Sequence, residues 1–236
     1  MHLVFWISWV SLAVSFVSAL FITADEFRHP QKMWIMNVVW PVTALYFSVV
    51  AVWAYLRIGR PMARHAGTQH APAAMRSTGE RTAAARNPSW SQTAVSTSHC
   101  GAGCTLGDIV AEFSLAALAL TLWGRTLYAA FAGDLLLAWL LGILFQYFSI
   151  KPMRSLSAAE ALVAAIKADT LSILSFEVGL FGWMAFSYFV LFPHPHLTPF
   201  QPAYWFMMQV GMVLGYFTAY PMNRWLIRAR WKEAMG

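Results

Sequence analysis

Long runs of apolar residues, separated by short polar segments, follow one another along most of this chain. A helix needs about 20 residues to span a bilayer. Six runs reach about that length, at residues 3–23, 34–56, 105–123, 127–150, 168–192 and 204–226. Pro41 lies inside the second run, where neighbouring helices can satisfy the carbonyl group that a proline leaves unbonded. The pattern predicts an all-α protein, a polytopic membrane bundle of about six transmembrane helices.

The composition supports this class. Hydrophobic residues make up 59% of the 236 positions and charged residues 11%, whereas soluble domains carry about 25% charged residues. The net positive charge does not indicate a nucleic-acid partner, because the basic residues lie in predicted loops on one side of the bundle. The sequence contains no phosphate-binding loop, nucleophile elbow or His-Glu-x-x-His helix. The expected partner is the lipid bilayer, and the expected location is the cell (inner) membrane.

Two changes in the pattern divide the chain into three parts. Residues 1–56 hold two N-terminal transmembrane helices, and the first run lacks the basic start of a signal peptide, which favours a membrane helix over a cleaved leader. Residues 57–98 are rich in alanine, serine, threonine and arginine, a composition typical of a flexible basic linker. Residues 99–236 form a four-helix membrane domain.

The distribution of basic residues predicts the orientation. Of the 16 lysines and arginines, 13 fall in the linker, in the connector at 151–167 and at the C-terminal end. Cytoplasmic loops carry an excess of Lys and Arg. Both termini and the linker are therefore expected in the cytoplasm, with the short loops outside.

Both cysteines of the chain lie where the linker runs into the third apolar stretch. If that segment is one helix, four side chains at steps of four share one face: Cys100, Cys104, Asp108 and Glu112. The nearby glycines each weaken helix propensity by about 1 kcal/mol, so an unwound start is the alternative. The stripe would line the cytoplasmic end of a membrane helix.

The thiols suggest metal chemistry. Cytoplasmic cysteines stay reduced, and Cys100 and Cys104 with the adjacent His99 provide soft and borderline ligands that suit copper first, or zinc. Two other interpretations stay open. The pair can act as a redox dithiol, or its small side chains can simply pack against a neighbouring helix.

Further polar side chains lie at the same predicted depth: Gln146, Asp169 and Glu177. Charged groups inside a bilayer face a bundle interior or a wet cavity. With few basic residues nearby, we expect a polar cavity open to the cytoplasm, where Asp108, Glu112, Asp169 and Glu177 carry a cation or protons. Asp134 lies apart and is expected to form a structural ion pair with Arg125, and a proton relay is the alternative.

The outer half of the predicted bundle offers a second set of soft ligands. His194 and His196 lie in an extramembrane loop, and Met207 and Met208 lie at the start of the last run. Imidazoles and thioethers there, leading to thiolates inside, would form a soft-cation route. Methionine is also common filler in helix packing, which is the simpler interpretation.

Five motifs resemble one bacterial membrane family: HCGAGCTLGDI at 99–109, GILFQYF at 142–148, KADTLS at 167–172, FEVG at 176–179 and YPMNRWLI at 220–227. In these residues the chain is similar to the family catalogued as domain of unknown function 4396, from about residue 99 to the end. The resemblance implies a membrane location and a helical fold. It implies no activity and no catalytic residues.

The sequence thus favours a protein that binds or transports a soft or transition-metal cation. The alternatives are a membrane dithiol redox relay and a structural or assembly subunit of a membrane complex. Further partners to consider are a second copy of the chain, in a homo-oligomer, or a cytoplasmic metal-handling protein. An enzymatic role is less favoured than transport.

Overall fold

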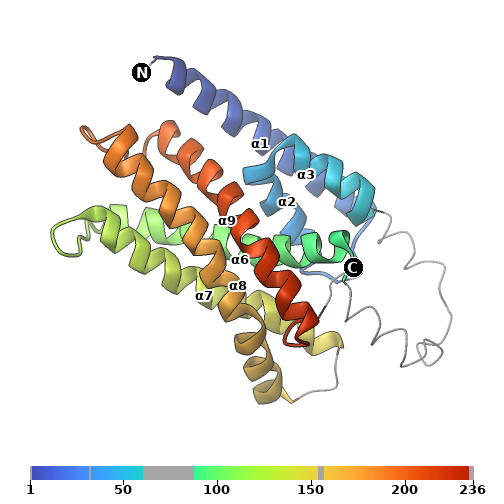
Figure 1. The fold of residues 1–236 in the computed structure, drawn as a ribbon. Helices are drawn as coiled ribbons and strands as arrows, with labels where there is room; N and C mark the ends of the chain where they lie inside the picture. The colour runs from blue at the N-terminus through green and yellow to red at the C-terminus, as the bar shows by residue number, and fades with distance from the viewer. Residues whose placement is uncertain (1, 32, 61–87, 154–156, 234–236) are drawn as a thin grey trace, which may run out of the picture.

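The computed structural model describes residues 2–31, 33–60, 88–153 and 157–233, and most of them are helical (Figure 1). The elements, in chain order, are α1 (His2–Arg28), α2 (Met36–Phe47), α3 (Val49–Ala54), the π-helical turn η1 (Tyr55–Gly59), α6 (Trp90–Ala117), α7 (Thr126–Met153), α8 (Ala158–Phe186), the π-helical turn η3 (Ser187–Leu191) and α9 (Pro202–Arg228). The prediction of an all-α protein is confirmed. The middle of the predicted linker, residues 61–87, lies outside the described residues.

Four helical segments of the described chain are long and apolar enough to cross a membrane. They are Leu3–Arg28, Trp90–Ala117, Thr126–Lys151 and Ala158–Leu191, the last formed by α8 and η3 together. Their length and composition indicate a membrane protein. Of the six runs that hydropathy marks, the second is broken into α2, α3 and η1, and the sixth corresponds to α9, which is long but more polar.

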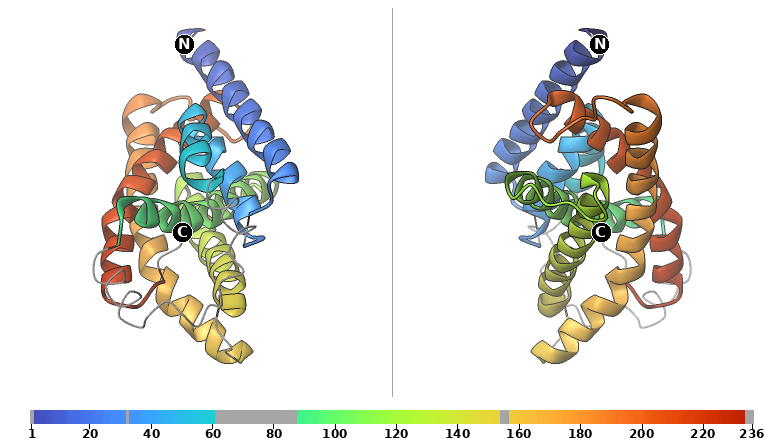
Figure 2. Two further views of the ribbon diagram at one scale, coloured as in Figure 1. Left: turned by 90° about the vertical axis from the view of Figure 1, so that its right-hand side faces the viewer. Right: turned by 90° about the vertical axis from the view of Figure 1, so that its left-hand side faces the viewer.

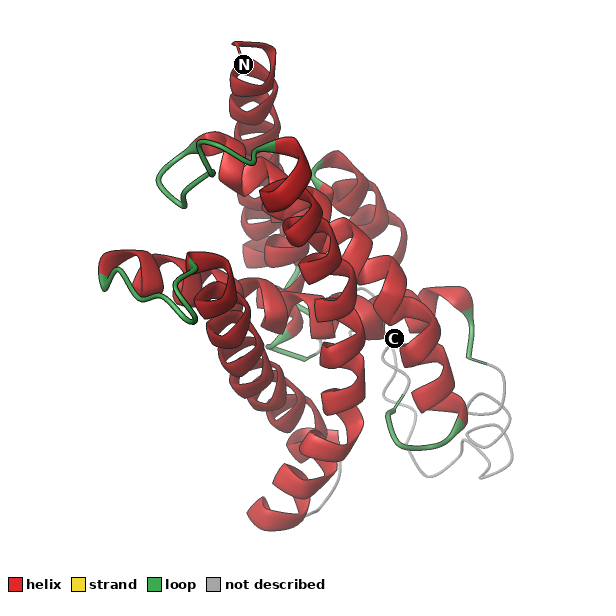
Figure 3. Cartoon of the chain, turned by 60° about the vertical axis from the view of Figure 1, so that its left-hand side comes forward, coloured by secondary structure: helices red, strands yellow, loops and turns green. Residues whose placement is uncertain are grey.

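Helix α6 lies at the centre of the fold. It packs along α7 and also contacts α8 and α9, while α8 runs beside α9 (Figures 1 and 2). Helix α2 packs on α6, and α1 lies along the outside against α2 and α9. The loops that join α6 to α7 and η3 to α9 lie at the same end of the domain (Figure 3). The third to sixth predicted spans therefore build one unit, with the N-terminal helices at its side.

The second predicted span is interrupted at Ser48, not at Pro41. Ser48 has a positive φ of 50°, and its hydroxyl hydrogen-bonds with Ser15 of α1 at 2.6 Å. The side-chain amide of Gln209, from α9, donates to Ser15 at 2.8 Å and to the Leu45 carbonyl at 2.6 Å. A break inside a membrane segment is tolerated where other helices satisfy the polar groups around it. Here α1 and α9 supply those partners, which the hydropathy pattern of residues 34–56 cannot reveal.

Helix α6 begins at Trp90, well before residue 105, where hydropathy places the third span. Ser89 caps it: the Ser89 hydroxyl accepts from the Gln92 amide, and the Gln92 side chain accepts from the Ser89 amide, each at 3.1 Å. The polar first turns are buried because their hydroxyls bond to carbonyls of their own helix, as Thr97 does to Thr93 at 2.8 Å. A helix whose hydroxyl groups bond to its own carbonyls has a polar sequence, but it can still pack in the interior of the bundle. Residues 90–98, assigned to the linker from composition, belong to this helix.

Candidate cation site

Four buried carboxyl groups gather between α6, α7 and α8. Asp108 and Glu112 lie one turn apart on α6, Asp134 comes from α7 and Glu177 from α8. Each residue is at most 4% exposed, and Asp108 is completely buried. We call these four residues the acid cluster. The described part of α6 is continuous from Trp90 to Ala117, so the stripe predicted from the sequence lies on one unbroken helix.

The members of the acid cluster act on one another. Glu112 lies beside the carboxyl of Asp134 and beside the hydroxyl of Tyr204 at the start of α9. Two ionised carboxyl groups side by side repel each other, which favours a proton or a cation between them. Asp108 interacts electrostatically with Glu112, Asp134 and Glu177. Both carboxyl oxygens of Asp108 and of Glu177 are buried without a hydrogen-bond partner.

No basic side chain of the described residues forms an ion pair with the acid cluster. The sequence suggested that Arg125 would pair with Asp134, but the Arg125 guanidinium lies over the Phe189 ring, 5.4 Å from its centroid. The pairing fails because Arg125 precedes α7 in the loop, at the end of the domain, while Asp134 points inward at Glu112. The cluster therefore holds four acids and no fixed counter-charge from the described chain.

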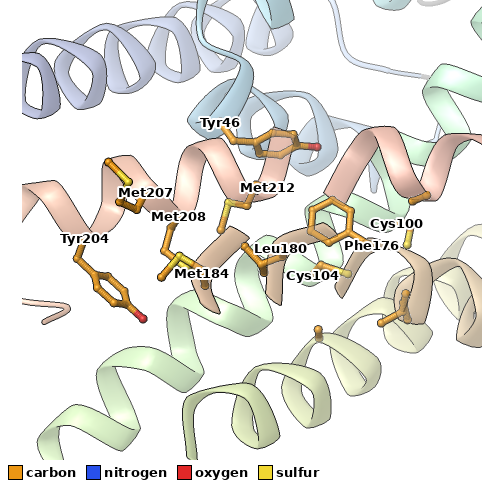
Figure 4. Close-up of a cluster of buried hydrophobic side chains, with 13 residues drawn as sticks. Tyr46, Cys100, Cys104, Phe176, Leu180, Met184, Tyr204, Met207, Met208 and Met212 are labelled. Carbon is orange, nitrogen blue, oxygen red and sulfur yellow. The ribbon is translucent and has the colours of Figure 1, made fainter. Parts of the chain in front are cut away.

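The two cysteines continue the polar stripe on α6. Cys100 and Cys104 are free thiols, both completely buried. The Cys104 thiol contacts Cys100 and faces the carboxyl of Glu177. Figure 4 shows the pair at one end of a row of buried methionines, Met184, Met207, Met208 and Met212, with Tyr204 at the other end.

His99 does not join the thiols. Its ring lies on the α7 side of α6, where Nε2 is 3.2 Å from the hydroxyl of Ser149 and the ring packs against Phe145 at 6.0 Å between centroids. Consecutive residues on a helix point about 100° apart, which separates His99 from Cys100. Within the described residues, no three His, Cys, Asp or Glu side chains are arranged to hold one metal ion.

Asp169 and Gln146 also lie apart from the acid cluster. Asp169 forms a completely buried ion pair with Lys232, a residue that lies beyond the end of α9. The Lys232 Nζ is 2.6 Å from the Asp169 Oδ1. Gln146 is completely buried on α7, and neither of its side-chain polar atoms has a hydrogen-bond partner. The ion-path residues expected from the sequence therefore fall into two groups: Asp108, Glu112 and Glu177 come together, while Asp169 is neutralised by the chain itself.

The outer soft-ligand candidates are also divided. Met207 and Met208 are buried in the hydrophobic core with the cysteines. His194 and His196 lie in the loop before α9 with ring centroids 5.1 Å apart, and His196 stacks on Tyr188 at 3.7 Å. The two methionines pack in the core on α9, whereas the two histidines stack with aromatic rings in the loop. The two pairs therefore lie in different surroundings.

A cavity of about 280 Å³ reaches the acid cluster. Glu112 and Tyr204 form part of its lining, together with Phe192 and the segment Leu197–Phe200 of the loop before α9. Its lining includes residues of the α6–α7 and η3–α9 loops, which lie at the same end of the domain (Figure 3). The sequence predicted a cavity at the opposite end, the one that the basic residues predict to be cytoplasmic. At that end the C-terminal segment instead folds back to insert Lys232 beside Asp169.

A family model for a domain of unknown function, DUF4396, matches residues 89–232. This chain belongs to the DUF4396 family. The match confirms the resemblance seen in the sequence and begins at Ser89, the cap of α6. It includes every residue of the acid cluster and ends at Lys232. No curated protein and no solved structure matches the chain.

Three residues of the DUF4396 domain gain importance that sequence reasoning did not give them. Asp134 was expected in a structural ion pair with Arg125, Tyr204 marked only the start of the last apolar run, and Lys232 was one of several basic residues at the C-terminal end. Asp134 offered a usable signal, because an acid within an apolar run rarely lies in a membrane segment without a functional partner. The positions of Tyr204 and Lys232 depend on how α9 and the tail pack on α6 and α8, which the sequence does not display.

Proposed function

We propose that this DUF4396 protein moves cations, protons first, across the bilayer, and that the acid cluster is the carrier site. The observation that supports this most is the group of four buried carboxyls without a basic partner among the described residues. A neutral carboxyl can hold a proton, and an ionised one can hold a cation, so a chain of acids at this depth can pass positive charge between helices.

Energetics favour a carrier role over a purely structural one. On insertion scales a charged group at the bilayer centre costs about 2.5–3.5 kcal/mol, so four carboxylates would cost about 10 kcal/mol or more. That approaches the whole stability of a typical domain, about 5–15 kcal/mol. The cluster must hold protons or a bound cation, and the unpartnered oxygens of Asp108 and Glu177 leave room for either. A purely structural cluster would be expected to have its oxygens hydrogen-bonded.

The topology of the carrier follows from charge placement. We propose six crossings, with α2, α3 and η1 together forming the second and α9 the sixth, in the cell (inner) membrane. The lysine and arginine asymmetry supports cytoplasmic termini. In this orientation the Glu112 cavity opens to the outside, and the Asp169–Lys232 pair lies at the cytoplasmic end.

Proton flux into liposomes tests the proposal. Purified protein is reconstituted with a pH-sensitive dye inside, and valinomycin with a potassium gradient sets the membrane potential. We expect Asp108→Asn to lower the protein-dependent flux by about tenfold or more, because the asparagine amide cannot take up and release a proton as a carboxyl does. A tenfold change in rate corresponds to about 1.4 kcal/mol in the barrier.

The matched control is Glu160→Gln. Glu160 is an exposed acid at the start of α8, and glutamine preserves its capping hydrogen bond to Ser157. This variant should keep wild-type flux. Wild-type flux no greater than that of empty liposomes, or equal flux in wild type and Asp108→Asn, would show that the acid cluster does not carry protons. Repeating the assay with sodium or potassium gradients distinguishes protons from metal cations.

A second candidate is transport of a soft cation, copper first. The observation that favours it is the buried cluster of two cysteine thiols and four methionine thioethers (Figure 4). This cluster meets the acid cluster where Cys104 faces Glu177. Thiolates and thioethers suit Cu(I). His99 is not part of this candidate site, and copper would travel between sulfur atoms and Glu177.

Metal analysis separates this candidate from the first. After anaerobic copper supplementation, soft-cation transport predicts about one equivalent of Cu(I) bound through the sulfurs of the purified chain, lost in the Cys100→Ser/Cys104→Ser variant. Met33→Leu removes a sulfur outside the cluster and should leave the copper content unchanged. Metal-free wild-type protein, or equal copper in the cysteine variant, would eliminate the soft-cation candidate and leave the proton carrier standing.

The dithiol relay has less support than either cation function. Side chains one turn apart on a helix have Cβ atoms about 5–6 Å apart, whereas a disulfide brings them to about 3.5–4.5 Å. Oxidation of Cys100 and Cys104 to a disulfide would distort α6, and both thiols are buried away from a protein partner. A role as an assembly subunit predicts no flux at all in the liposome assay.

A further inference from the structure

The cavity that ends at Glu112 has a lining unlike that of a simple ion path. It lies among the C-terminal halves of α6 and α8, the start of α7, and the loop and first turn of α9. Most of its wall consists of alanine, leucine, methionine and aromatic side chains. A bare proton or a hydrated metal ion gains nothing from such walls, whereas an organic molecule with an apolar body does.

Glu112 gives this cavity its chemical selectivity. Among the residues that line it, Glu112 alone carries a carboxyl group, and no lysine, arginine or histidine is present in the lining. Its side chain is 4% exposed. The nearest acids behind it, Asp134 and Asp108, belong to the acid cluster, so an anionic ligand would be repelled and a cationic ligand attracted.

Aromatic residues surround the space in front of Glu112. Tyr188, Phe192, Phe200 and Tyr204 all line the cavity, and the Tyr204 hydroxyl lies beside the Glu112 carboxyl. Aromatic rings attract an ammonium group by about 0.5–2 kcal/mol per contact, most strongly when water is excluded. A buried carboxyl beside aromatic walls is therefore suited to an organic ammonium ion.

The volume limits the size of the ligand. An apolar cavity of about 150 Å³ accepts benzene, and drug-sized ligands occupy about 300–1,000 Å³. A cavity of about 280 Å³ accommodates a compact molecule with one ring or a short branched chain.

We propose that this cavity binds a small monovalent organic ammonium ion, with the ammonium group at Glu112 and the apolar body against the aromatic and aliphatic wall. The inference rests on the proposed carrier function in one respect: it names the substrate class that the acid cluster would exchange for protons. Binding itself does not require transport and can be measured alone.

Equilibrium binding to the full chain in lipid nanodiscs tests the proposal by calorimetry with two probes of the same shape, benzylammonium and neutral benzyl alcohol. We expect benzylammonium to bind about tenfold or more tightly, since a charge-assisted hydrogen bond is worth at least about 1.4 kcal/mol. Glu112→Gln should abolish this preference and leave benzyl alcohol binding in place. Glu160→Gln should keep the preference.

A second variant keeps the test valid if Glu112→Gln folds poorly. Ala130→Leu leaves the carboxyl in place and narrows the cavity, so the affinities for both probes should fall together. Equal affinity for the two probes, no measurable benzylammonium binding, or a preference that survives Glu112→Gln would each overturn the inference. If proton flux depends on Asp108 but benzylammonium does not bind, this inference alone is refuted. If benzylammonium binds but the protein carries no flux, the carrier function alone is refuted.

Discussion

Replacing Lys232 with methionine is expected to lower the free energy of unfolding by about 3–5 kcal/mol, because it leaves the Asp169 carboxylate buried without a partner. Both side chains are completely buried, and the ammonium nitrogen lies 2.6 Å from the carboxylate oxygen. The C-terminal segment turns back through Arg230, at a φ of 60°, and the Lys232 amide bonds to the Leu226 carbonyl. Unfolding in mixed detergent micelles, followed by tryptophan fluorescence, measures the change.

A double variant shows whether the loss of stability comes from leaving Asp169 without its ion-pair partner or from losing the packing of the Lys232 side chain. Lys232→Met combined with Asp169→Leu removes both charges, and it should restore wild-type stability or exceed it, since apolar replacements of buried ion pairs are often neutral or stabilising. Lys151→Met removes an exposed cation that lies over Tyr147 and should change stability by no more than about 0.5 kcal/mol. If the single variant at Lys232 were as stable as wild type, the ion pair would not hold the C-terminal segment in place.

Replacing Gly107 with valine is expected to disrupt the α6–α7 contact and to cost about 3 kcal/mol or more, at the upper end for overpacking. A Cβ at Gly107 would lie 2.4 Å from the Ala138 amide nitrogen and 2.5 Å from its Cα, so the backbone of α7 would have to move. One turn earlier, a Cβ at Gly103 would lie 2.8 Å from the Cα of Gly142. Close approach of two helices at small residues is the common basis of membrane helix pairing.

Gly182 on α8 provides the matched control. A Cβ there meets nothing within 4 Å, so Gly182→Ala should raise stability by about 1 kcal/mol or less through helix propensity. The same unfolding assay compares the two glycines. Because α6 and α7 carry three of the four acids, Gly107→Val should also reduce proton flux even in the fraction that remains folded. Equal stability of Gly107→Val and wild type would contradict the close α6–α7 contact.

Hydropathy located the helices because burial in lipid depends on local composition. The runs at 127–150 and 168–192 correspond to α7 and to α8 with η3, with differences at their ends. The errors occur where other helices supply what the local sequence lacks. Ser48 breaks the second run with partners from α1 and α9, and the first turns of α6 hide hydroxyls that their own helix satisfies.

The sequence by itself determined the class of the protein, its family, the stripe of Cys100, Cys104, Asp108 and Glu112 on one helix, and the shortage of basic residues near the acids. These follow from residue spacing and composition. Which polar groups meet was decided by the tertiary structure, because it depends on the rotation and register of each helix against the next. The contact of Gly103 and Gly107 with α7 brings Asp134 to Glu112. The return of the C-terminal segment assigns Lys232 to Asp169 rather than to the acid cluster, which therefore has no basic partner among the described residues.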